Sequence, residues 1–133
     1  MKRLAALIVA LAAIGTLLLG ATPRVDSQQG PQMRFEKASH NFGTLTKGGE
    51  EVEVEFRFVN SGDAPLIITR TTTSCRCITI RSPKRPVRAG AEGVITVSYD
   101  PKDEGVFNKS ITVEANIPGG QITLYVSGEV VRK

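Results

Sequence analysis

Two cysteines separated by a single residue are the side chains of this sequence best suited to covalent chemistry. Cys75 and Cys77 lie in the segment "TTTSCRCITI", and they are the only cysteines among the 133 residues. Two thiols this close can form a local disulfide, exchange electrons with other thiols, or bind Cu(I) or Zn²⁺ as thiolates. They can also be packed side chains with a structural role only. The residue types alone leave these alternatives open.

The spacing of the two cysteines limits how they can be joined. In an extended strand, residues i and i+2 lie about 6.6 Å apart, whereas a disulfide most often joins Cα atoms about 5.5–6 Å apart. A Cys75–Cys77 disulfide therefore requires a bend at Arg76, whose charge would also favour a neighbouring thiolate. Two thiolates and the single histidine, His40, fall short of the four ligands of a closed zinc site. We expect a mainly structural pair with no cofactor, and keep thiol–disulfide redox chemistry and Cu(I) or Zn²⁺ binding as alternatives.

A second candidate site is a run of cations that no acidic residue interrupts. Its members are Arg76, Arg81, Lys84, Arg85 and Arg88. Such a patch could bind an anionic envelope polymer or lipid head groups. No aromatic residues lie between the cations, so stacking against nucleic-acid bases is disfavoured. The prolines Pro83 and Pro86 are more typical of a solvated loop.

The sequence lacks the short motifs of several common enzyme classes. It contains no GxxxxGK[ST] phosphate loop, no GxSxG turn and no HExxH zinc motif. Asp100, Asp103 and Glu104 gather in "DPKDEG", but without the alternating spacing of an EF-hand loop, which favours a solvated turn. We therefore expect a protein without enzymatic activity and without a metal site at this turn.

The N-terminus has the form of an export signal. Lys2 and Arg3 precede an apolar run of 16 residues, 4–19, which is short for a spanning helix of about 20 residues. We expect a signal peptide over residues 1–21 that is cleaved after Ala21, with an uncleaved membrane anchor over 4–19 as the alternative. Cleavage lowers the formal net charge from +4 to +2, too little to indicate nucleic-acid binding. Export to the periplasm, the cell envelope or the medium provides an oxidising compartment, in which a disulfide persists.

Behind the signal, a polar segment leads into a domain with the hydrophobic period of β-strands. Residues 22–32, "TPRVDSQQGPQ", are rich in polar residues, proline and glycine and predict a flexible linker. In "VEVEFRFVN", Val52, Val54 and Phe56 alternate with charged residues, as expected for a strand with one buried face. The same alternation marks "VITVSYD", "KSITVEAN" and "QITLYVSGEVV", and further β segments are expected in "APLIITRTTTS", 33–36 and 40–45.

About seven short strands in a domain spanning residues 33–133 predict an all-β fold. Turn sequences such as "NSGDAP" and "NIPGG" separate the strands, and no helical period follows residue 21. This pattern indicates an immunoglobulin-like antiparallel β-sandwich, with a small barrel as the alternative. The chain has no tryptophan, so the Cys…Trp…Cys pattern of true immunoglobulin domains is absent.

The order of these segments resembles a secreted bacterial family known as domain of unknown function 1573. The resemblance runs from Phe35 to Val130 and includes "NSGDAPLII", "SCRC" and "GVF". It implies an immunoglobulin-like sandwich and export, and it implies no established activity. Arg76 stands where the family has a glycine between the cysteines, and Asn41 where the family has an acidic residue. Because glycine would ease the bend, Arg76 is expected to make the small disulfide ring harder to close.

Together these observations predict an exported, non-catalytic module of the cell envelope. Its partner is expected to be an envelope protein or polymer that strand patterning does not identify, because sandwich domains bind through loops and edges of variable sequence. Contact with a membrane is expected only through residues 4–19, if they are not removed.

Overall fold

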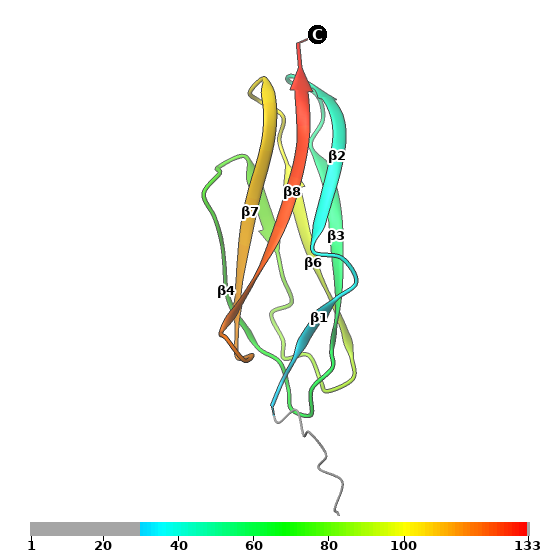
Figure 1. The fold of residues 1–133 in the computed structure, drawn as a ribbon, viewed down its shortest axis with the longest axis vertical. Helices are drawn as coiled ribbons and strands as arrows, with labels where there is room; N and C mark the ends of the chain where they lie inside the picture. Colours follow the sequence, from blue (N-terminus) through cyan, green and yellow to red (C-terminus); the bar gives the residue numbers. More distant parts are fainter. Residues whose placement is uncertain (1–29, 133) are drawn as a thin grey trace, which may run out of the picture.

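Residues 30–132, which the computed structural model describes, form eight β-strands that lie in two layers (Figure 1). The strands are β1 (Met33–Phe35), β2 (Ser39–Thr46), β3 (Val52–Asn60), β4 (Ile68–Thr73), β5 (Ile78–Arg81), β6 (Glu92–Tyr99), β7 (Gly105–Ala115) and β8 (Gln121–Val131). The signal predicted for residues 1–21 and residues 22–29 of the predicted linker lie outside the described residues. In the described part of the chain, no helix is long and apolar enough to cross a membrane.

Each layer is a four-stranded sheet. Sheet A has the order β1-β3-β6-β5 and sheet B the order β2-β8-β7-β4. Neighbouring strands pair antiparallel, except for β2 and β8, which pair in parallel. The predicted all-β sandwich is therefore confirmed, and β5 is a strand beyond the seven that the alternation predicts.

The core lies between the two sheets and follows from the period-two pattern. In β3, Val54, Phe56 and Phe58 are at most 8% exposed, whereas the charged residues between them face solvent. The buried side chains of β7 and β8 that face them from sheet B are Phe107, Ile111, Val113, Leu124, Val126 and Val130. Burial of one such side chain stabilises the fold by about 1.5–3 kcal/mol, so this double layer holds the two sheets together.

A fully buried asparagine organises one end of the sandwich. The Asn60 Oδ1 accepts hydrogen bonds from the backbone N–H groups of Gln32 at 3.2 Å and Gly62 at 3.1 Å. Its Nδ2 donates to the carbonyl oxygens of Ala64 at 2.7 Å and Val87 at 2.9 Å. An amide side chain has two donors and two acceptor lone pairs, so Asn60 is fully satisfied. It joins the segment before β1, the turn after β3 and the β5–β6 connection.

Candidate functional site

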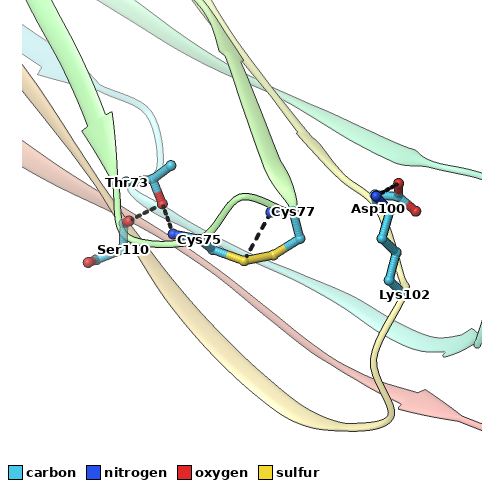
Figure 2. Close-up of a disulfide and its surroundings, with 6 residues drawn as sticks. All are labelled: Thr73, Cys75, Cys77, Asp100, Lys102 and Ser110. Carbon is cyan, nitrogen blue, oxygen red and sulfur yellow. Dashed lines mark hydrogen bonds and ion pairs between the residues drawn. A yellow bond between two sulfur atoms is a disulfide. The ribbon is translucent and has the colours of Figure 1, made fainter.

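Cys75 and Cys77 are joined by a disulfide in the crossover from sheet B to sheet A (Figure 2). Their Cα atoms lie 5.2 Å apart, and the chain turns so that the Ile78 N–H donates to the Cys75 carbonyl at 3.3 Å. Within residues 30–132, positive φ angles occur only at glycines. Arg76 therefore takes part in the bend without a left-handed backbone conformation, and it does not prevent the ring from closing.

Hydrogen bonds attach this turn to both sheets. The Thr73 hydroxyl accepts from the Cys75 N–H at 3.5 Å and donates to the Ser110 carbonyl on β7 at 3.0 Å. On the other side, the Asp100 N–H donates to the Cys77 carbonyl at 2.9 Å. Both cysteines are half-buried and pack against the core. Hydrogen bonds and packing therefore hold this turn in place in addition to the S–S bond.

The two sulfur atoms differ in their surroundings. The Cys77 backbone N–H donates to the Cys75 Sγ at 3.3 Å, and no such donor is present at the Cys77 Sγ within residues 30–132. A hydrogen-bond donor stabilises a thiolate, so negative charge is better accommodated on Cys75 than on Cys77. While the disulfide is closed neither sulfur is a thiolate, and neither can bind Cu(I) or Zn²⁺ in this state. No group of three His, Cys, Asp or Glu side chains suited to a metal ion occurs among residues 30–132.

His40, the single histidine, lies in β2 and contacts Lys37 and Phe42. The Lys37 Nζ donates to the His40 Nδ1 at 3.1 Å, and the imidazole packs edge-on against the Phe42 ring with centroids 4.8 Å apart. Burial, and secondly the positive charge of Lys37, lower the pKa of His40 from its ordinary value of 6.5. In the described part of the chain, no serine hydroxyl or carboxylate forms a hydrogen bond with this imidazole. His40 therefore has the environment of a strand residue with a local hydrogen bond.

The five predicted cations follow the edge strand β5 and the connections at its two ends. Arg76 precedes β5, Arg81 is its last residue, and Lys84, Arg85 and Arg88 lie in the β5–β6 connection. Only Arg81 thus lies on the edge strand itself, and the other four cations flank it along the chain. We call these five residues the basic edge. Within residues 30–132 only Arg81 among them forms an ion pair, with the Glu53 carboxylate at 2.9 Å, and such exposed pairs contribute at most about 1 kcal/mol.

Sheet B carries a hollow of about 380 Å³ on its outer face, which sequence reasoning missed. Its lining residues are Asn41, Gly43, Thr44, Val106, Phe107, Asn108, Ser127, Gly128 and Glu129. A bulge in β2 shapes it: Gly43 has a φ of 78°, and its N–H donates to the Asn41 Oδ1 at 2.7 Å. A Cβ built on Gly128 would lie 2.9 Å from the Gly43 carbonyl oxygen and 2.8 Å from the Phe107 ring. The bulge therefore rests directly on β8, in contact that only a residue without a side chain at position 128 permits.

The register of three strands brings the polar residues of the hollow together. Ser127 of β8 pairs with Asn41 of β2 on one side and with Asn108 of β7 on the other. These three strands lie side by side (Figure 1). The rim comes from three distant segments, so no sequence motif marks it. The signal in the sequence that could have indicated the hollow is a glycine within each of two strand segments, Gly43 and Gly128, because a glycine inside a strand indicates a bulge or a close backbone approach.

One exposed apolar side chain lines the hollow, and a second lies near it on β8. Val106 is 81% exposed and pairs across the strands with Glu129, and Tyr125 is 47% exposed and precedes Ser127 by two residues on the same face. Single exposed apolar residues are common on protein surfaces, but apolar side chains beside a concavity are typical of binding sites. This face of sheet B, rather than the cysteine turn, therefore has the shape of a binding surface.

The fold has several solved counterparts. The chain is similar to a protein of unknown function from Porphyromonas gingivalis W83, with a TM-score of 0.68 and 19% identity over 82% of this chain and 51% of that chain. It is also similar to the ASH / PapD-like domain 7 of human CEP192, with a TM-score of 0.65 and 12% identity over 92% of this chain and 99% of that chain. The VesB protease of Vibrio cholerae matches with a TM-score of 0.58 and 16% identity over 74% of this chain and 31% of that chain. At these identities the likeness shows the fold alone, which confirms an immunoglobulin-like, PapD-like β-sandwich.

Residues 33–130 match the family described as "Protein of unknown function (DUF1573)". The match covers well over half of the chain, so the chain belongs to this family, as the sequence resemblance predicts. The chain spans about half the length of the Porphyromonas protein to which it is similar. No curated protein sequence matches it.

Proposed function

We propose that this chain is a non-catalytic binding module of the cell envelope, to which it is exported. The observation that carries the binding role is the hollow on the outer face of sheet B, which is lined in part by the exposed side chain of Val106 and has the exposed Tyr125 two residues from its lining residue Ser127. Membership in a family of unknown function with an immunoglobulin-like sandwich agrees with such a role. Export is supported by Lys2 and Arg3 ahead of an apolar run, and by a disulfide of a kind that persists in oxidising compartments.

The test of this function is co-sedimentation of the purified full chain with washed envelope fragments of the source organism. Val106→Asp places a charge beside the hollow, and Thr72→Asp places the same charge on edge strand β4 of the same sheet. Both side chains are exposed, so neither substitution is expected to change the free energy of unfolding by more than about 0.5 kcal/mol. We expect saturable binding that weakens at least about tenfold with Val106→Asp and little with Thr72→Asp. Lack of saturable binding, or equal binding by the wild type and Val106→Asp, would contradict the proposal.

The basic edge is the second surface of this module, suited to an anionic polymer. Its charges other than Arg81 form no ion pair within residues 30–132, so they remain available to an external anion. Contacts of this kind weaken as salt is raised, whereas hydrogen bonds and apolar contacts in the hollow depend on salt much less. The salt dependence of envelope binding therefore separates the two surfaces.

Thiol–disulfide exchange is the second candidate function, and the closed disulfide is the observation that favours it. An external thiolate would attack the Cys77 sulfur, forming a mixed disulfide and releasing Cys75 as a thiolate. The Cys77 N–H at 3.3 Å from the Cys75 sulfur supports this direction. A second external thiolate would then attack the mixed disulfide and release the Cys77 thiolate. Two electrons thus pass from an external dithiol, which becomes a disulfide, to the pair.

An exchange assay separates the two candidates. The full chain and a Cys75→Ser, Cys77→Ser double variant are compared for oxidation or isomerisation of a reduced test protein. For a structural pair, we expect the wild type to give no more acceleration than an equal concentration of free dithiol. Much faster exchange by the wild type, lost in a double variant that still folds, would replace the binding role with the redox role.

A further inference from the structure

The polar groups that line the hollow are neutral amides and hydroxyls with one carboxylate. Asn41, Asn108, Thr44 and Ser127 provide groups that both donate and accept hydrogen bonds, and Glu129 accepts only. Within the described residues, the side chains of Asn108, Ser127 and Glu129 form neither hydrogen bonds nor ion pairs with other parts of the chain. These groups are free to bind a ligand that is itself rich in donors and acceptors.

The charge of the hollow excludes most ionic ligands. Glu129 is the only charged residue among its lining residues, so an anion would be repelled. A cation would meet a single exposed carboxylate, which binds it weakly. A neutral hydroxyl, by contrast, can donate a charge-assisted hydrogen bond to that carboxylate. A neutral ligand with several hydroxyl groups fits this set of side chains.

The apolar neighbours of the hollow narrow the ligand further. Tyr125 lies about 6.8 Å from Ser127 along β8 on the same face, and its ring is 47% exposed. The face of an aromatic ring is negatively polarised, and it therefore attracts the weakly positive C–H groups on one face of a sugar ring. The volume of about 380 Å³ lies near the lower end of small-molecule sites, roughly 300–1,000 Å³. Because the hollow opens on the outer face of the sheet, a polymer chain can continue beyond it.

We propose that the hollow on sheet B binds a neutral sugar unit, with Asn108, Ser127 and Glu129 as hydrogen-bonding groups and Tyr125 as a stacking platform. The source of this sugar is a neutral envelope polysaccharide. The inference rests on the proposed function, because it names the ligand class of the same binding face.

The test uses the full chain on immobilised oligosaccharides. The neutral probes contain glucose, galactose or mannose units, the anionic probes contain uronic acids, and free monosaccharides serve as competitors. We expect saturable binding to at least one neutral oligosaccharide, at least about tenfold weaker with Asn108→Ala and with Tyr125→Ala. Thr72→Ala, on the same sheet but outside the hollow, should bind as the wild type does. Binding to no neutral probe, preference for uronic acids, or unchanged binding by both hollow variants would overturn the inference.

Two comparisons identify the source of the sugar and keep this inference separate from the proposed function. If the natural ligand is a polysaccharide, oligosaccharides should compete at much lower concentrations than monosaccharides do. Equal competition by both would contradict a polysaccharide as the source of the sugar. Periodate cleaves the vicinal diols of sugars, so envelope fragments treated with periodate should no longer bind the protein. If the protein still binds fragments treated with periodate but not fragments treated with a protease, the sugar inference is overturned and an envelope-binding role remains. Binding to neutral oligosaccharides without binding to envelope fragments would support the sugar site and contradict the proposed envelope role.

Discussion

Breaking the Cys75–Cys77 disulfide should destabilise the domain only slightly. The closed loop contains three residues, 75–77. The loop-closure relation for the unfolded chain gives an entropy of about 5.4 cal/mol/K for this loop, or about 1.6 kcal/mol at 25 °C. A loop of 15 residues would give about 3 kcal/mol. The small loop therefore contributes about half as much as an ordinary short-loop disulfide.

The local hydrogen bonds of the turn should survive the loss of the S–S bond. The contacts of Cys75 with Thr73 and of Cys77 with Asp100 use backbone groups of the cysteines. In a Cys75→Ser, Cys77→Ser variant, the serine at 75 can also accept from the N–H of residue 77, as the Sγ does now. We expect the double variant to lose about 1.6 kcal/mol in the free energy of unfolding. For a domain of this size, that loss corresponds to a Tm lower by roughly 6–13 °C.

The assay is urea unfolding of the full chain followed by far-ultraviolet circular dichroism. Oxidised wild type, wild type with a reducing agent, and the double variant are compared under the same conditions. We expect the last two samples to agree within about 0.5 kcal/mol, because both lack the same constraint. A loss above about 4 kcal/mol, or the absence of a cooperative transition, would show that the bond itself holds the crossover in place and would refute this reasoning.

Four further outcomes are expected. Asn60→Ala removes the four hydrogen bonds of a buried side chain and should lower the free energy of unfolding by about 3 kcal/mol in urea titrations. Gly128→Ala forces a Cβ against the Gly43 carbonyl oxygen at 2.9 Å and should cost about 1–3 kcal/mol in the same assay. Because the pKa of His40 is lowered in the folded state, the unfolded chain binds more protons there; stability should be complete above pH 6.5 and fall as the pH drops below it toward the lowered pKa. A His40→Asn variant should lose this part of the pH dependence of Tm. N-terminal sequencing of the envelope fraction should give Thr22 as the first residue.

Each of these expectations has a clear contrary result. Asn60→Ala or Gly128→Ala within about 0.5 kcal/mol of the wild type would mean that the surrounding backbone is less constrained than its contacts indicate. An unchanged Tm profile in His40→Asn would show that other groups control stability below pH 6.5. Recovery of an intact N-terminus from membranes would favour the anchor over residues 4–19.

The strands could be predicted from the sequence because one buried face imposes a period of two. The alternation in "VEVEFRFVN" and "VITVSYD" marks β3 and β6 directly, and both strands lie in the centre of sheet A. Partner choice could not be predicted in this way. The parallel pairing of β2 with β8 depends on contacts between residues some 85 positions apart, such as His40 and Val126. An alternating strand is compatible with a neighbour in either direction.

The candidate sites were predictable to different degrees. The one-residue spacing of Cys75 and Cys77, compared with the Cα–Cα distance of a disulfide, was enough to predict that joining them requires a bend. The effect of Arg76 could not be judged in the same way, because it depends on a backbone conformation that the sequence does not specify. The hollow required the register of three strands, since Asn108 and Ser127 become neighbours only when β7 and β8 pair.

Photo-crosslinking in intact cells tests the central claim most directly, namely that the outer face of sheet B binds an envelope component. A diazirine amino acid is placed at Val106, in the hollow, or at Glu55, an exposed position on β3 of sheet A that belongs to neither the hollow nor the basic edge. We expect crosslinked products in the envelope fraction from position 106, and few or none from position 55. Equal crosslinking from both positions, or none from position 106, would contradict it.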